Sequence, residues 1–179
     1  CNLYLNYNDP QLKWDPQKYS GISETAFNGE CSSNDCIWSP PIYVLETSEK
    51  PYEQFMPVKR RVDYKGNVNG GRLGLMKLNA NFGLKKYPYD TQTIKITFEM
   101  WQYDNTFINL IPNKIKKSSR YTDNISFNAD NFSQRIIKDD SWSQVEFKFT
   151  LTRNYQGFDK VIIYPALFLA LLSAFFVIV

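Results

Sequence analysis

The sequence predicts an all-β antiparallel sandwich followed by one transmembrane α-helix. Short runs of alternating apolar and polar residues recur between turn residues at a spacing of about 8 to 12 residues, which is typical of sandwiches. The clearest alternation places Val145, Phe147, Phe149 and Leu151 on one face of a strand. The last 19 residues, 161–179, carry no charged side chain and are nearly long enough to cross a bilayer as a helix.

The N-terminal part is expected to consist of strands and hairpins. Residues 3–7 alternate and predict a first strand. Two further strand segments, 58–62 and 66–69, flank a turn in which Gly66 is expected to take a positive φ. The Asn-Gly-Gly run at 69–71 predicts a bulge or a second turn.

A turn followed by a strand occupies the middle of the chain. Pro88 fixes its own φ and disfavours a helical conformation at Tyr87, while Asp90 is suited to hydrogen-bond the backbone after the turn. Residues 91–98 then alternate, which predicts a half-buried strand with a mostly apolar face. At its far end Trp101 and Tyr103 share a face, either as core aromatics or as a π-surface that holds a ligand cation.

The C-terminal part is expected to add further strands. Residues 108–111 form a short apolar run that ends at Pro112, and residues 125–127 form another. The arms 134–138 and 145–153 predict a hairpin around residues 139–143.

Composition argues against an enzyme. The sequence contains no histidine, which removes histidine-based acid–base catalysis and the commonest metal ligand. The formal net charge of +3 is too small to indicate a nucleic-acid partner. We therefore expect neither an enzyme nor a cofactor.

The three cysteines allow one short bridge. Cys31 and Cys36 lie in a polar loop that can bring them within bridging distance, so a disulfide between them is expected, although spacing alone does not decide its redox state. Cys1 has no evident partner. A zinc site is not expected, because no second pair of Cys or His completes four ligands.

The apolar C-terminus divides the chain into two parts. We expect a sandwich over residues 1–157 and a first transmembrane helix over 158–179, joined without a flexible linker. The alternative for the apolar run is a buried helix of a soluble protein. No signal peptide is recognisable at the N-terminus, and the chain is expected to be a piece of a longer protein.

The order and spacing of several motifs resemble the pentameric ligand-gated ion channels, the superfamily that includes the nicotinic acetylcholine receptor. The resemblance extends over nearly the whole chain and implies an immunoglobulin-like ligand-binding sandwich. The first strand of the family's sandwich is expected to be missing from this chain. The resemblance is carried by residues 7–16 (Tyr-Asn-Asp-Pro-Gln-Leu-Lys-Trp-Asp-Pro), 37–40 (Ile-Trp-Ser-Pro), 87–92 (Tyr-Pro-Tyr-Asp-Thr-Gln), and by Arg153 placed 12 residues before Pro165.

One departure from the family concerns its name-giving cysteines. The animal receptors carry two cysteines that close the loop around the Pro-containing turn, and this chain has Ala80 and Ile94 at those positions. In this respect the chain resembles the cysteine-less prokaryotic members. The sequons Asn124-Ile-Ser and Asn131-Phe-Ser are short enough to occur by chance and would be irrelevant in a bacterial protein.

The resemblance also implies a ligand site between subunits. Trp101 matches the family's principal-face Trp, with Tyr103 beside it, and Trp142 lies in a shortened capping hairpin, either over the ligand or on the surface. Leu45 and Asn2 stand where the family has aromatic residues. A cationic small-molecule agonist fits this set, whereas a complete acetylcholine cage does not.

Protons are the second candidate agonist. Four carboxylates would titrate near neutral pH if burial or like charges raised their pKa values. They are Asp90, Asp139, Asp140 and Glu146.

Gating residues follow from the same resemblance. The turn residues Tyr87, Pro88, Tyr89 and Asp90 are expected to meet Arg153 at the membrane face and to couple the sandwich to the pore. An ion pair that forms in one state and separates in another can bias a two-state element. The alternative is a surface ion pair that has no role in gating and contributes little to stability.

The implied assembly is a homopentamer in the plasma (inner) membrane, with the sandwich extracellular or periplasmic. Its partners would be a small-molecule agonist or protons, the permeating ions and the bilayer. The alternative function is a single-span receptor or adhesion module with an immunoglobulin-like domain. The full reading frame distinguishes the two, because a channel subunit continues into three more apolar segments.

Overall fold

The computed structural model describes residues 2–28, 37–47, 55–57, 59–74, 76–100, 102–113, 115, 126–138 and 141–178. They form two compact units, which are described separately. The first unit comprises Cys1–Asn79 with Met100–Gln102, and the second comprises Ala80–Glu99 with Tyr103–Val179.

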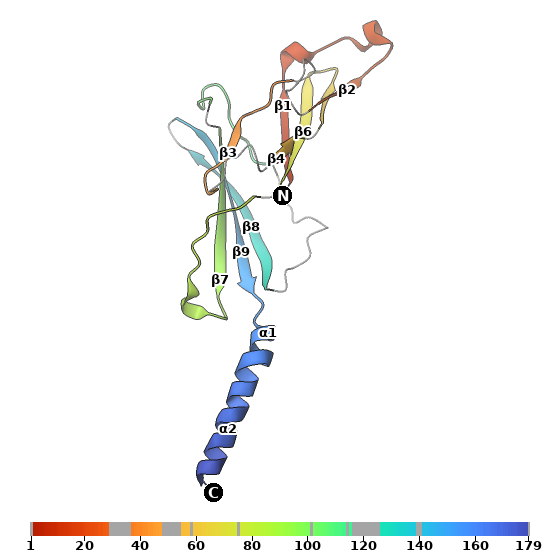
Figure 1. Ribbon diagram of the computed structural model, residues 1–179. Helices are drawn as coiled ribbons and strands as arrows, with labels where there is room; N and C mark the ends of the chain where they lie inside the picture. The colour runs from red at the N-terminus through yellow and green to blue at the C-terminus, as the bar shows by residue number, and fades with distance from the viewer. Residues whose placement is uncertain are drawn as a thin grey trace. The chain divides into compact units, whose positions relative to one another are not determined.

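The first unit contains an antiparallel sheet with the strand order β1-β6-β5-β2, in which β4 also pairs with β6 (Figure 1). The strand β3 (Ile42–Val44) belongs to the same unit. The sheet strands are β1 (Asn2–Asn8), β2 (Glu24–Phe27), β4 (Phe55–Pro57), β5 (Arg60–Asp63) and β6 (Asn67–Gly74). Short 3-10 helices at Pro10–Leu12 and Pro16–Tyr19 follow β1.

The core of this unit lies on one face of its sheet. Ile37, Val62 and Val68 are buried, and partly buried side chains pack around them. These surrounding residues are Tyr7, Leu12, Trp14 and Phe27. Val62 and Val68 face each other across β5 and β6, which explains why both are among the most completely buried side chains.

The β5–β6 hairpin confirms one turn prediction and corrects another. Gly66 has a φ of 80°, as the sequence predicts for this turn. The Asn-Gly-Gly run is neither a bulge nor a turn, because residues 69–71 lie within β6 in regular register with β1. A Cβ on Gly70 would lie 2.7 Å from Cγ of Arg60, so this glycine makes room for a buried arginine.

The second unit contains the adjacent antiparallel strands β7, β9 and β8, in that order (Figure 1). Their bounds are Thr91–Met100 for β7, Phe127–Lys138 for β8 and Ser143–Arg153 for β9. The predicted strand at 91–98 and the predicted hairpin are therefore confirmed. Residues 126–127 do not form a separate strand, because Phe127 begins the long strand β8.

Residues 108–111 are not a strand, contrary to the prediction from their apolar run. Backbone amides in and just before this run bond to side chains, one nearby in sequence and one distant, instead of to a ladder. Asp104 Oδ1 accepts a hydrogen bond from the Thr106 backbone at 2.9 Å, and the Leu110 amide donates to Oγ of Ser143 at 2.7 Å.

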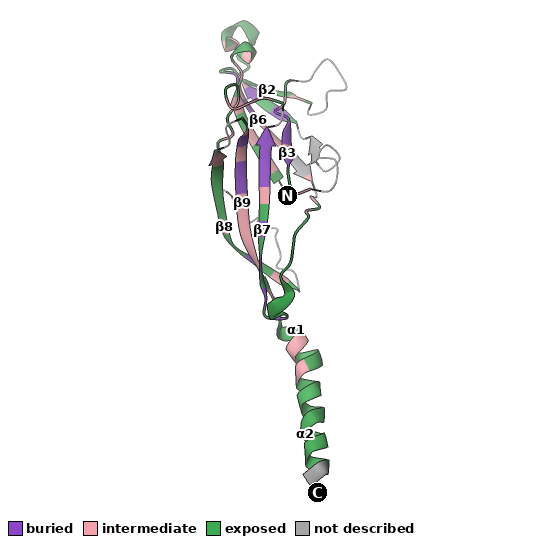
Figure 2. Cartoon of the chain, turned by 90° about the vertical axis from the view of Figure 1, so that its left-hand side faces the viewer, coloured by how far each residue is buried: buried purple, intermediate pink, exposed green. Residues whose placement is uncertain are grey.

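The chain ends in a helical segment. It begins with α1 (Gln156–Phe158), continues through a π-helical stretch at Asp159–Ile163 and ends with α2 (Tyr164–Ile178). Residues Gln156–Phe176 are long and apolar enough to cross a membrane, and none of this span is buried in the protein. Figure 2 shows the exposure along α2. Two antiparallel sheets followed by one such helix confirm the predicted fold class.

Candidate functional site

The Pro-containing turn stands between a 3-10 helix, Leu84–Lys86, and the start of β7. The Tyr87–Pro88 peptide bond is cis. The Tyr89 amide donates to the Lys86 carbonyl at 2.7 Å, which closes the turn. Pro88 is buried whereas Tyr87 and Tyr89 are exposed, so the turn presents two aromatic rings outward.

Asp90 and Arg153 form a two-point ion pair directly after this turn. Nε of Arg153 donates to Oδ1 of Asp90 at 2.7 Å, and Nη2 donates to Oδ2 at 3.2 Å. The Arg153 amide also donates to the Asp90 carbonyl at 3.2 Å, which extends the β7–β9 ladder by one step. Such fork geometry is the strongest form of a carboxylate–arginine contact. The sequence predicted this pair, and the structure brings its members together.

Burial and hydrogen bonding fix the charge state of the pair. The Asp90 side chain is 2% exposed and that of Arg153 is 20% exposed. Hydrogen bonds from Arg153 and then from Gln92 lower the pKa of Asp90 to about 2. The bond to Asp90 in turn raises the pKa of Arg153. Both side chains are therefore charged at neutral pH.

Gln92 holds the turn to the ion pair and was assigned no role from the sequence. Its Nε2 donates to Oδ2 of Asp90 and to the Gly83 carbonyl, and its Oε1 accepts from the Gly83 amide. The side chain is buried. A polar residue on the apolar face of the predicted strand was the available signal, because a buried amide needs several partners.

Two aromatic rings enclose the Arg153 guanidinium. Its Cζ lies 4.9 Å from the centroid of the Tyr87 ring and 4.4 Å from that of Phe127. Cation–π contacts of this kind add to the ion pair. No sequence pattern singled out Phe127, because the position depends on how β8 lies beside β9.

The turn also contacts the start of the C-terminal helical segment. Tyr89 Oη donates to Oδ1 of Asp159 at 2.9 Å, and its ring lies 5.0 Å from that of Tyr155. The Tyr87 ring meets Phe158 edge-on, with centroids 5.4 Å apart. The bond to Asp159 raises the pKa of Tyr89. Asp90, Arg153 and the two tyrosines thus form a continuous contact network, called here the junction cluster, from β7 and β9 to the helix.

The predicted ligand residues are described only in part. Tyr103 and Trp142 are both half-buried. The Asn105 amide donates to the Ser141 carbonyl at 3.1 Å, so the segments that carry these two residues are held together. The remaining predicted ligand, acidic and disulfide residues lie outside the described residues: Trp101, Asp139, Asp140, Cys31 and Cys36.

Glu146 is surrounded by cations that lower its pKa. Its side chain is 1% exposed and contacts Lys95 at 3.1 Å, Arg135 at 2.6 Å and Lys148 at 3.1 Å. Burial favours protonation, but hydrogen bonds from the three cations lower the pKa to about 2. The condition for proton sensing by Asp90 and Glu146, a raised pKa, is therefore not met, because both pKa values are lowered.

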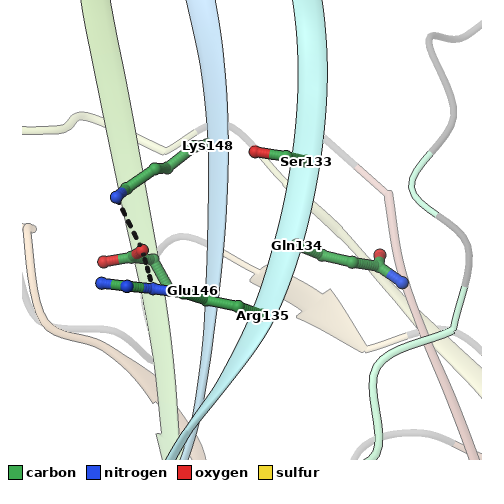
Figure 3. Close-up of a pocket in the computed structure, with 5 residues that line it drawn as sticks. All are labelled: Ser133, Gln134, Arg135, Glu146 and Lys148. Atoms are coloured by element: carbon green, nitrogen blue, oxygen red, sulfur yellow. Dashed lines mark hydrogen bonds and ion pairs between the residues drawn. The ribbon is translucent and has the colours of Figure 1, made fainter.

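Arg135, Glu146 and Lys148 border a small surface pocket of about 250 Å³. Figure 3 shows Arg135 and Lys148 converging on Glu146, with Ser133 and Gln134 on the neighbouring strand β8. Among the described residues, no group of three or more His, Cys, Asp or Glu side chains is arranged to hold a metal ion.

The chain matches known receptors over most of its length. Residues 1–164 match the family described as the neurotransmitter-gated ion-channel ligand binding domain. The chain is 27% identical to the rat (Rattus norvegicus) neuronal acetylcholine receptor subunit beta-3 over 112 residues. This match covers 62% of this chain and 23% of that protein. The chain is 22% identical over 173 residues to the acetylcholine receptor subunit beta-type unc-29 of Caenorhabditis elegans, covering 96% of this chain and 34% of that protein.

A third relative is the acetylcholine receptor subunit beta of Xenopus laevis, 25% identical over 125 residues, which cover 70% of this chain and 24% of that protein. The chain thus spans between about a quarter and a third of the length of the relatives it matches. These relatives are receptor subunits, which confirms that the chain is not an enzyme. With residues 1–164 matched, the chain belongs to the family of neurotransmitter-gated ion-channel ligand-binding domains.

Proposed function

We propose that this chain is the ligand-binding part and first membrane helix of a pentameric ligand-gated ion-channel subunit, and that its junction cluster couples binding to pore opening. The observation that carries the proposal is the two-point Asp90–Arg153 pair, which lies at the end of β9 just before the helix begins. The family match supports the receptor function, and the apolar helix supports a membrane location.

The coupling follows from the contacts. Arg153 is bound to the turn through Asp90 and Tyr87, and the turn reaches the helix through Tyr89 and Asp159. A displacement of the turn relative to β9 must therefore break charge-assisted bonds or carry the helix start with it. If the turn has one position with these bonds formed and another with them broken, it has two discrete states, and a ligand can bias the equilibrium between them.

The ligand site belongs to the opposite end of β7. That strand begins beside Asp90 and ends at Met100, next in sequence to Trp101. With about 3.3 Å per residue, its ten residues span on the order of 30 Å. Trp101, Tyr103 and Trp142 are proposed to contact a cationic small-molecule agonist through their ring faces. The names of the relatives, acetylcholine receptor subunits, support an amine rather than a proton as the agonist.

The proposed assembly is a homopentamer in the plasma membrane with the sandwich outside the cell. The alternative, a single-span adhesion module, is disfavoured by the family match. If this subunit gives no current when expressed alone but gives current when co-expressed with a related subunit, the assembly is heteromeric.

The experiment that tests the function is current recording from the full-length protein, with a panel of amines applied at fixed pH and then pH steps applied without amine. We expect amine-evoked current and no proton-evoked activation between about pH 5 and 8. Trp101→Ala should weaken the response to the active amine, whereas Trp38→Ala, at an exposed tryptophan outside the proposed site, serves as the control. Protein at the cell surface that conducts under neither stimulus, alone or together with a related subunit, would contradict the proposal.

A further inference from the structure

We propose that Asn131 carries an N-linked glycan, attached on the strand β8 of the extracellular domain. The inference rests on the proposed extracellular location. Asn131-Phe132-Ser133 is one of two Asn-X-Ser/Thr sequons in the chain, the other being Asn124-Ile125-Ser126. Because acceptor asparagines in folded proteins must lie at the surface, the structure can test whether Asn131 has room for a sugar, whereas Asn124 lies outside the described residues.

A β-bulge sets Asn131 apart from the surrounding ladder. The register between β8 and β9 shifts between Asp130 and Ser133, so Asn131 has no regular partner residue on β9. Asn131 has a φ of 54°, a left-handed conformation that asparagine adopts more readily than most residues. The bulge therefore suits an asparagine for a backbone reason and also frees it from the pairing pattern.

The side chains around the bulge leave the acceptor accessible. Asn131 and Ser133 are both exposed, whereas Phe132 between them is half-buried and stacks on Phe149 with ring centroids 5.6 Å apart. The bulge thus directs the apolar residue of the sequon onto the sheet and leaves its two reacting positions in solvent. Figure 3 shows Ser133 on β8, where it is one of the residues that line the pocket.

The described contacts of the Asn131 amide are compatible with a sugar. Its Nδ2 donates one hydrogen bond, to Oγ1 of Thr150 at 3.1 Å. In the transfer reaction, Nδ2 attacks the anomeric carbon of a lipid-linked oligosaccharyl diphosphate, an N–C bond forms, the C–O bond to the diphosphate breaks, and Nδ2 releases one proton. The lipid diphosphate is the leaving group. One N–H remains on the amide, which suffices for one hydrogen bond.

A glycan at this position would shield a sheet edge. Among the described strands, β8 ends the order β7-β9-β8 and pairs only with β9. Unpaired strand edges are sites of unwanted association, and proteins commonly cover or interrupt them. A hydrated sugar on the bulge adds bulk beside this edge without entering the core.

The test uses the full-length protein expressed in cultured animal cells and isolated by surface biotinylation. We expect peptide:N-glycosidase F to convert Asn131 to aspartate, detected by mass spectrometry of the tryptic peptide. Asn131→Gln and Ser133→Ala should each lower the apparent mass on a gel by the one mobility step that a single glycan adds. Ser133→Thr should keep that step. Asn128→Gln, at an exposed asparagine of the same strand outside any sequon, is the matched control and should change nothing.

The possible failures are distinct. Surface-labelled protein whose Asn131 is unmodified overturns the glycan and leaves the channel proposal intact. Protein that is neither surface-labelled nor modified at either sequon overturns the extracellular location, and with it both proposals. Retention of the mobility step in the Ser133→Ala variant would also contradict the assignment.

Discussion

At the scale of single residues, Arg153 has the densest set of specific contacts in the junction cluster. It makes a fork to Asp90 and lies against two rings, contacts that a planar guanidinium satisfies and an ammonium does not. The contacts therefore demand more than a positive charge. This distinguishes the pair from the surface pair Glu24–Arg61, in which both side chains are more than half exposed and 3.7 Å apart.

Arg153→Lys is expected to impair gating although it keeps the charge. Losing the fork and the stacking should shift the open–closed equilibrium by about tenfold, within the usual range of coupling energies. Single-channel open probability at saturating agonist measures the shift. Arg61→Lys is the control and should be silent, and an equal effect of the two substitutions would refute the special role of Arg153.

The two shifted carboxylates make a signed prediction about pH. Asp90 and Glu146 have pKa values of about 2, below their usual values of 3.8 and 4.5. Because both are lowered, their contribution to stability is complete above those usual values and is lost as the pH falls toward about 2. The melting temperature of the purified protein should thus not change between about pH 6 and 8 on account of these two groups. Below about pH 4 it should fall.

Glu146→Gln should reduce this acid sensitivity. A gating midpoint between pH 5 and 7 that disappears in Glu146→Gln would show instead that the carboxylate titrates near neutral pH, against the lowered pKa.

At the scale of elements, Gln92 links the turn to β7. Its amide bonds both backbone groups of Gly83 and the Asp90 carboxylate. Gln92→Ala removes these three buried or part-buried hydrogen bonds and should cost about 1–3 kcal/mol of unfolding free energy. Hydrogen exchange at the Gly83 amide should accelerate strongly. Thr93→Ala, at the next exposed position of β7, is the control, and unchanged exchange at Gly83 in the Gln92 variant would contradict the clamp.

The β5–β6 hairpin depends on one glycine in the same way. A Cβ at Gly66 would lie 2.3 Å from the Asp9 carbonyl oxygen, and the residue has a φ of 80°. Gly66→Ala should therefore destabilise the domain by about 1 kcal/mol or more. Gly83→Ala, with no atom within 4 Å of its added Cβ, should be much milder in a denaturant melt. Equal midpoints for the two variants would disprove the steric requirement.

How far the sequence predicted the structure depends on the range of the interactions. Strands with a clear two-residue period, such as β7 and β9, and the Gly66 turn were recognisable because their patterns are local. The apolar run at 108–111 misled because its amide partner is the distant Ser143. The position of Phe127 and the direction of the Glu146 pKa depend on neighbouring strands, so they were not accessible from one segment at a time. Gln92 bonds groups of its own segment, and its polar side chain on an apolar face was a usable signal.

At the scale of the whole molecule, the exposed apolar helix requires an apolar environment that the described residues do not supply. Its 21-residue span at 1.5 Å per residue is about 30 Å long, matching the hydrocarbon core. The π-helical stretch ends at Ile163, two residues before Pro165, which cannot donate to a preceding carbonyl. The helix start is thus irregular at the point where Tyr89 contacts it through Asp159, which suits a segment that moves during gating.

The central claim, that the Asp90–Arg153 pair couples binding to pore opening, is tested most directly by a double-mutant cycle in the full-length channel. Asp90→Asn, Arg153→Gln and their combination are compared by single-channel open probability, with agonist binding and surface expression measured in parallel. The account predicts that each single variant loses about tenfold in the opening equilibrium, that the double variant loses no more than either single one, and that binding persists. Additive losses, or normal gating in both single variants, would contradict it.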